Sequence, residues 1–201
     1  MKHSILYAIL ACAVLISCSP STKIIKSWQE PGSSITLASP NKVLVISMVK
    51  DESTRRIIED QLLKRFNGQA VASYTLISAD ALKEANEASL NDKLTQGQFT
   101  HVLLSRLADV EKETSYVPGT TTAYYGGYGR YYRYGAGFYN TPGYYTTDKN
   151  YFVETTVYTV NPNKLIWTGT SKTVNPSTLD KTVNEIADAV SDKMKKDGFL
   201  K

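Results

Sequence analysis

The stretch VLVISMV, residues 43–49, sets the pattern for the rest of the chain. Its near-continuous aliphatic run is typical of a strand that is buried on both faces of a sheet. Apolar residues then recur at helical spacing: Ile57, Ile58, Leu62 and Phe66. Ser53 is placed to cap this helix and Gly68 to end it. A buried strand followed by an amphipathic helix predicts a sheet with helices packed against it.

The same alternation continues along the chain. Residues 70–77 predict a second strand, and Ser78 is placed to cap a second helix that ends at Gly97. Residues 100–110, with an aliphatic centre, predict a third strand. An order of strand, helix, strand, helix, strand predicts right-handed crossovers.

The C-terminal part predicts two more strands and a last helix. Residues 151–160 and 165–173 are rich in β-branched residues and are separated by a turn at residues 161–164. A helix is expected from Ser177, with an apolar stripe of Leu179, Val183, Ile186, Ala187, Val190 and Met194. The predicted fold class is therefore α/β (α+β): a mixed sheet of about five strands, in the order β-α-β-α-β-β-β-α, with helices packed on it.

Residues 114–147 differ in character from the rest of the chain. They contain ten of the 14 tyrosines and seven of the 12 glycines. We predict a long low-complexity loop inserted between two strands, because glycine at this density raises the cost of ordering. Tyrosine with glycine is a composition favoured in adaptable binding surfaces. The candidate binding residues are Tyr124, Tyr125, Tyr128, Arg130, Tyr131, Tyr132, Arg133 and Tyr134. An insertion with no dedicated partner is the alternative.

The N-terminus resembles a bacterial lipoprotein signal. An apolar run from Ile5 to Ile16 is too short to span a bilayer, and it ends in LISC at residues 15–18. The resemblance implies that residues 1–17 are removed and that Cys18 carries acyl chains such as palmitate; the alternative is an ordinary secretory signal. Residues 18–40 would form an anchored linker and strap, and residues 41–201 a single domain. Within the strap, residues 24–28 predict an edge strand or a covering segment, with Trp28 as a packing anchor.

Little in the composition suggests chemistry. Removal of residues 1–17 leaves a net charge of about +3 and no cysteine besides Cys18, so neither a nucleic-acid partner nor a disulfide is expected. His101 is interpreted as structural. Glu59 and Arg55 have the spacing of a surface ion pair. Acidic residues alternate at the end of the third predicted strand, at Asp109, Glu111 and Glu113; a solvated edge is favoured over weak cation binding. We expect no enzyme, cofactor or metal.

The order of these features resembles that of uncharacterised Gram-negative, Bacteroidota-like envelope lipoproteins. It is also similar to the small α/β domain of the TolB amino-terminal domain and of the curli secretion lipoprotein. Ser19 after Cys18, with no acidic cluster, implies an outer-membrane lipoprotein that faces the periplasm. The resemblance implies a non-catalytic binding or assembly accessory that contacts an envelope protein or peptidoglycan. The alternative is a subunit of an oligomeric outer-membrane assembly or export complex.

Overall fold

The computed structural model describes residues 21–38, 40–78, 80–81, 87–117, 121–122, 139–140 and 144–201. Six strands form one mixed sheet in the order β1-β8-β7-β4-β2-β3. Their bounds are β1 Thr22–Gln29, β2 Val43–Ser47, β3 Ala70–Ala72, β4 His101–Val117, β7 Tyr144–Thr159 and β8 Lys164–Val174. The mixed α/β class is confirmed, and the sixth strand is β1, which pairs with β8 at the sheet edge.

The fully buried strand β2, which lies between β4 and β3, is the one that the sequence identified first. β2 runs parallel to both β3 and β4, and all five of its residues are buried. From β4 onward the strands β7, β8 and β1 are antiparallel. A strand buried on both faces needs cover on both sides, and the helices supply that cover.

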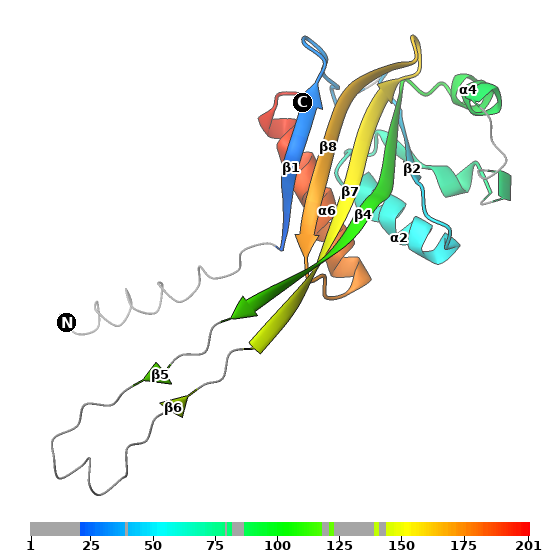
Figure 1. Ribbon diagram of the computed structural model, residues 1–201. Coiled ribbons are helices and arrows are strands. Elements are labelled where there is room, and N and C mark those ends of the chain that lie inside the picture. Colours follow the sequence, from blue (N-terminus) through cyan, green and yellow to red (C-terminus); the bar gives the residue numbers. More distant parts are fainter. Residues whose placement is uncertain are drawn as a thin grey trace, which may run out of the picture.

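Helices lie on both faces of the sheet, but unequally. α2 (Glu52–Leu63) and α6 (Leu179–Lys196) pack on one face, where Val43 and Val45 join the core of Leu62, Phe66 and other apolar residues. α4 (Glu87–Gln96) lies on the other face, where Leu94 packs with Leu44 and Ile46. Figure 1 shows α2 and α6 behind the sheet and α4 beside its β2 end.

Several details differ from the sequence prediction. Asp51, not Ser53, caps α2 by accepting a hydrogen bond from the Thr54 amide at 2.7 Å, and Thr178 takes the corresponding place before α6. Trp28 is 44% exposed and is not the packing anchor. Trp167 fills that role: its ring is fully buried and stacks on Phe199 with centroids 6.1 Å apart.

The ion pair of Arg55 and Glu59 is buried, which contradicts the surface pair expected from its spacing. The two side chains are 1% and 0% exposed, and Arg55 Nε donates to Glu59 Oε1 at 3.1 Å. The other guanidinium nitrogens bond Glu52, the Ser73 hydroxyl and the Ile77 carbonyl. A buried charge is tolerated only when it is paired and hydrogen-bonded throughout.

The carboxylate of Glu59 also explains why the second predicted strand is short. It accepts hydrogen bonds from the amide of Ser47 at 2.9 Å, the hydroxyl of Ser73 at 2.6 Å and the amide of Tyr74 at 3.1 Å. The chain therefore leaves the sheet after Ala72 and forms a 3-10 turn at Ser73–Thr75 instead of continuing as a strand to residue 77.

His101 stands at the start of β4, 9% exposed, with its Nδ1 hydrogen-bonded to the Thr100 hydroxyl at 2.8 Å. Burial lowers its pKa from the ordinary value, because the charged imidazolium loses its hydration.

We predict that Glu59→Gln lowers the free energy of unfolding by about 3–5 kcal/mol, because it leaves Arg55 buried without a counter-charge. Arg56→Met is the matched control on the same helix: its exposed pair with Glu52 should contribute less than about 1 kcal/mol. Urea denaturation measures both. A loss for Glu59→Gln no larger than for the control would show that the buried pair does not hold the fold.

We predict that His101 makes the protein less stable as the pH falls from about 7.5 to 5.5. The folded-state pKa of His101 lies below that of the unfolded chain, so the unfolded state binds the proton first and gains population. The slope from this residue should not exceed about 1.4 kcal/mol per pH unit. Denaturation at both pH values should show a smaller difference for His101→Asn than for the natural chain; an unchanged difference would contradict the assignment.

Candidate interaction surface

Two strands run past the others and form a projecting arm, defined here as residues 109–117 of β4 and 144–151 of β7, of which Asn150 and Tyr151 at the root still pair with β8. Their ladder continues without interruption from Asp109, paired with Phe152, to Val117, paired with Tyr144. β2 ends at Ser47, whose partner on β4 is Ser105, and β8 ends at Val174. Beyond these points, no described strand pairs with the outer edge of β4 or of β7. Figure 1 shows the two strands leaving the body together.

The arm corrects the predicted boundaries of the inserted loop. Residues 114–117 and 144–147 are strand, not loop, and a further short pair, β5 (Thr121–Thr122) with β6 (Tyr139–Asn140), follows beyond them. These residues form strands because the two segments pair with each other. The lack of an apolar periodicity in the sequence does not exclude such pairing. The eight candidate binding residues between Tyr124 and Tyr134 lie outside the described residues, as does Cys18.

The root of the arm is fixed by a bulge and by one asparagine. The ladder shifts register between Leu107 and Asp109, and Asp109 accepts a hydrogen bond from the Val110 amide at 2.7 Å. A bulge of this kind bends the strand pair. Asn175, with φ of 48°, follows β8: its Oδ1 accepts from the Lys149 amide at 2.9 Å and its Nδ2 donates to Asp148 at 2.7 Å. The end of β8 is thereby tied to β7 where the arm begins.

The register gives the arm two faces of opposite charge. Lys112 pairs directly with Lys149, and four residues further out along each strand Tyr116 pairs with Tyr145. These residues share a face, since side chains alternate along a strand; we call it the basic face. The acidic face carries Asp109, Glu111, Glu113 and Asp148, so the three alternating acidic residues of β4 do lie on one side.

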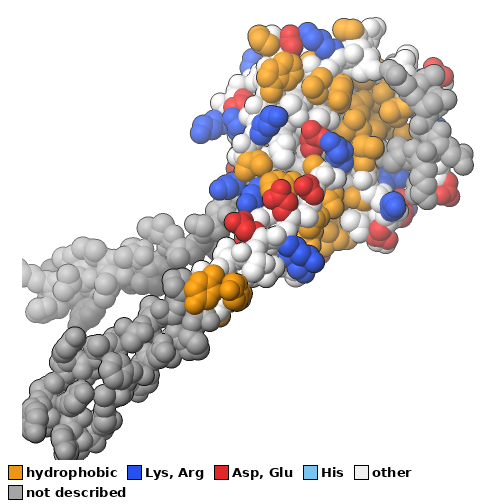
Figure 2. All heavy atoms as spheres, in the orientation of Figure 1, with side chains coloured by type: hydrophobic (Ala, Val, Ile, Leu, Met, Phe, Trp, Pro, Cys, Tyr) orange, Lys and Arg blue, Asp and Glu red, His pale blue; other side chains and the backbone are white. Residues whose placement is uncertain are grey.

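Exposed tyrosines gather at the outer end of the described arm. Tyr116, Tyr144 and Tyr145 are 56%, 58% and 74% exposed, and the rings of Tyr116 and Tyr145 lie 5.1 Å apart. No charged residue occurs at positions 114–117 or 144–147. Figure 2 shows the hydrophobic side chains at this end and charged side chains nearer the body. Aromatic rings of this exposure suit a contact surface.

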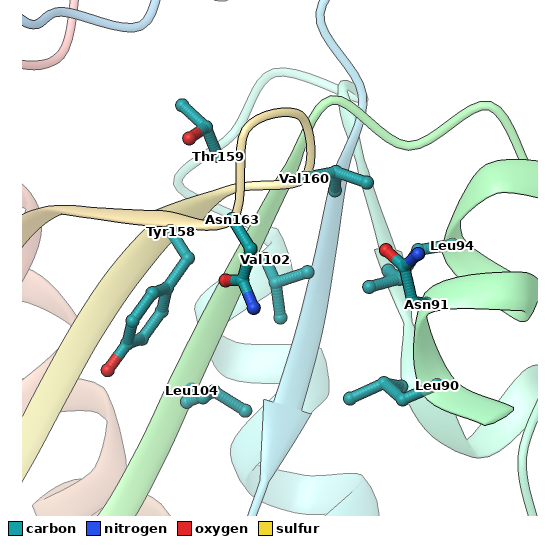
Figure 3. Close-up of a pocket in the computed structure, with 9 residues that line it drawn as sticks. All are labelled: Leu90, Asn91, Leu94, Val102, Leu104, Tyr158, Thr159, Val160 and Asn163. Carbon is teal, nitrogen blue, oxygen red and sulfur yellow. The ribbon is translucent and has the colours of Figure 1, made fainter. Parts of the chain in front are cut away.

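The body has a shallow pocket of about 210 Å³ between α4 and the sheet. Its lining is mostly apolar: Leu90, Leu94, Val102, Leu104 and Val160, with Asn91, Tyr158, Thr159 and Asn163 (Figure 3). The described lining residues include no carboxylate, histidine, cysteine or basic side chain, and their mostly apolar groups suit a small apolar ligand. Within the described residues, no group of three His, Cys, Asp or Glu is placed to hold a metal ion.

Comparison with known proteins gives likenesses to distantly related solved structures. No family model and no curated protein matches the chain. Among solved structures, the PelC dodecamer from Paraburkholderia phytofirmans is 12% identical with a TM-score of 0.45, over 83% of this chain and 94% of that one. Lipoprotein GNA1162 from Neisseria meningitidis is 11% identical with a TM-score of 0.40, over 78% and 99%. Identities and TM-scores this low assign no function to this chain.

No helix in the described part of the chain has both the length and the apolar composition that a bilayer crossing requires.

We predict that Asn175→Ala loosens the arm while leaving the body intact. The substitution removes two side-chain hydrogen bonds and places alanine at a positive φ, which together should cost about 1–3 kcal/mol. Hydrogen exchange should quicken at the amides of residues 144–151 and stay unchanged in β2. Asn175→Gly also removes the two hydrogen bonds but tolerates the positive φ, so it separates the effect of the lost bonds from that of backbone strain. If hydrogen exchange in the arm were as slow in both variants as in the natural chain, Asn175 would not fix the arm.

Proposed function

We propose that this chain is a lipid-anchored envelope protein that acts as a non-catalytic accessory, holding a protein partner along its arm. The observation that carries the proposal is the arm itself: two long strands whose outer edges lack a described strand neighbour. Unpaired backbone N–H and C=O groups on a strand edge are a template for an added strand. A two-stranded ribbon is also marginally stable in water by itself, so a partner would stabilise it.

The anchor in this proposal is Cys18, supported by the LISC sequence at residues 15–18. Several acyl chains on one cysteine give firm attachment, whereas a single chain gives only marginal binding. With Ser19 following the cysteine, we place the protein on the outer membrane, facing the periplasm. The tyrosine-rich residues from Tyr124 to Tyr134 would extend the same contact surface.

A second function is favoured by the opposite positions of the two open edges. The outer edge of β4 in one copy, which has no strand neighbour among the described residues, could pair with the outer edge of β7 in the next copy. Such a head-to-tail contact closes into a ring or extends as a filament. The chain would then be a subunit of an oligomeric outer-membrane assembly or export complex.

The proposal is tested by capture of partners from detergent-solubilised envelopes with the acylated protein as bait. One variant replaces residues 112–149 by a two-residue Asn-Gly turn, which removes the arm; a second replaces residues 120–141 by a short Gly-Ser linker, which removes only the tyrosine-rich part. Asp92→Ala, on exposed α4, is the control. We expect the natural chain and the control to retain a protein that the armless chain loses.

The same samples separate the alternatives. If the detergent-solubilised protein has a mass several times that of one chain and contains no other protein, the chain is a subunit of an oligomer. Sedimentation with purified sacculi indicates a peptidoglycan ligand. Equal retention of a partner by the armless chain would show that the arm is not the contact surface.

A further inference from the structure

We propose that the basic face of the arm, made by Lys112, Lys149, Tyr116 and Tyr145, lies on the anionic surface of the bilayer that holds the lipid anchor. This inference rests on the proposed attachment at Cys18 and adds what the arm itself touches. It assigns Tyr116 and Tyr145 to the membrane interface and leaves the strand edges to a protein partner.

The anchor and the arm leave the body at the same end. One row of paired residues crosses the sheet there: Thr22 of β1 pairs with Thr173, Thr173 with Tyr151, and Tyr151 with Val110. Thr22 is the first residue of β1, and Val110 and Tyr151 are where the arm begins. Figure 1 shows the start of β1 at the end of the body from which β4 and β7 emerge.

The tether is shorter than the arm. Four residue steps join Cys18 to Thr22, and a fully extended chain spans at most about 14 Å over that length. From Val110 to Val117 the arm rises by seven steps, or about 24 Å at the spacing of antiparallel strands. The row through Thr22 is therefore held close to the membrane, and the arm is long enough to reach it.

The direction of the body decides where the arm lies. The paired strands extend from this row in one direction, and the arm extends in the other (Figure 1). The body has ionic side chains on its surface, among them the pairs Arg65–Asp188 and Lys164–Glu30, so it must remain in water. With the body on the water side, the arm is on the membrane side.

The chemistry of the basic face suits this place. Lys112 and Lys149 stand directly opposite each other, an arrangement that is unfavourable in water and is relieved by a negative surface. The tyrosine pair further out has the apolar ring and polar tip that are typical of membrane interfaces. Glu111, Glu113 and Asp148 are on the opposite face, where an anionic surface would repel them, so charge selects which face turns to the bilayer.

The test uses the acylated full-length protein in vesicles of phosphatidylethanolamine and phosphatidylglycerol. An environment-sensitive fluorophore is attached at Tyr145→Cys, and at Asp92→Cys on α4 as the reference in water. We expect the Tyr145→Cys label to emit at shorter wavelength and to be quenched by brominated lipids, and the reference label to show neither effect. Adding Lys112→Glu with Lys149→Glu should return the first label to the emission of the reference.

Glu111→Gln with Glu113→Gln is the matched control, because it changes two charges on the other face and should leave the first label in lipid. Two labels that behave alike in vesicles that carry the protein would overturn the inference and leave the anchor standing. Failure of the protein to float with the vesicles would overturn the anchor, and with it both proposals. Emission at shorter wavelength from the Tyr145→Cys label in native envelopes, but not in vesicles, would assign the basic face to a protein contact. That result would overturn the membrane contact.

Discussion

The buried pair of Arg55 and Glu59 determines the shape of this sheet. The Glu59 carboxylate accepts a hydrogen bond from the amide of Ser47, the last residue of β2. At this level of the sheet β3 has already ended, since its last pair with β2 is Ala72 with Val45. Arg55 then ties the turn after β3 to α2 through Ser73 and Ile77. Because a half-satisfied buried charge is strongly unfavourable, this end of the sheet cannot shift without breaking the whole network. β2 and β3 stop here, while β4, β7, β8 and β1 continue, and only beyond Val174 of β8 do β4 and β7 run on without a strand neighbour among the described residues.

The short strands β2 and β3 thus lie beside two strands, β4 and β7, that extend well past them. The β4–β7 ladder passes from a region covered by α2 and α6 into one with no layer over either face among the described elements. The bulge at Leu107/Asp109 and the bonds of Asn175 to β7 fall at that transition. The body has a core of its own, so order in the arm depends on pairing between its two strands and on whatever lies against them.

Local sequence predicted most of the body and little of the arm. The aliphatic residues 43–46 and the apolar stripe on α6 predict buried elements, because the positions of apolar residues along the sequence indicate which faces are buried. The capping residue of α2 was displaced by two positions, because Asp51 and Ser53 are both capable caps and the chain geometry chooses between them. Arg55 and Glu59 have the same spacing as a solvent-exposed pair. The groups that surround the pair come from other parts of the sequence: Ser47, Ser73, Tyr74 and Ile77. The arm is ordered by pairing between two segments that are separated by 27 residue positions at Val117 and Tyr144 and by 43 at Asp109 and Phe152. No periodic pattern within either segment indicates that pairing.

The position of β1 has a mechanical consequence. β1 is the edge strand, its first residue Thr22 is the end nearest the N-terminus, and it lies antiparallel beside β8 along its whole length. A pull on the N-terminal side, directed away from the body, acts along the strand axis. Such a load is shared by the hydrogen bonds of the β1–β8 ladder in shear, whereas a pull across the sheet would open them one after another. Tension between a fixed N-terminus and the domain is therefore resisted by the strand that receives it first.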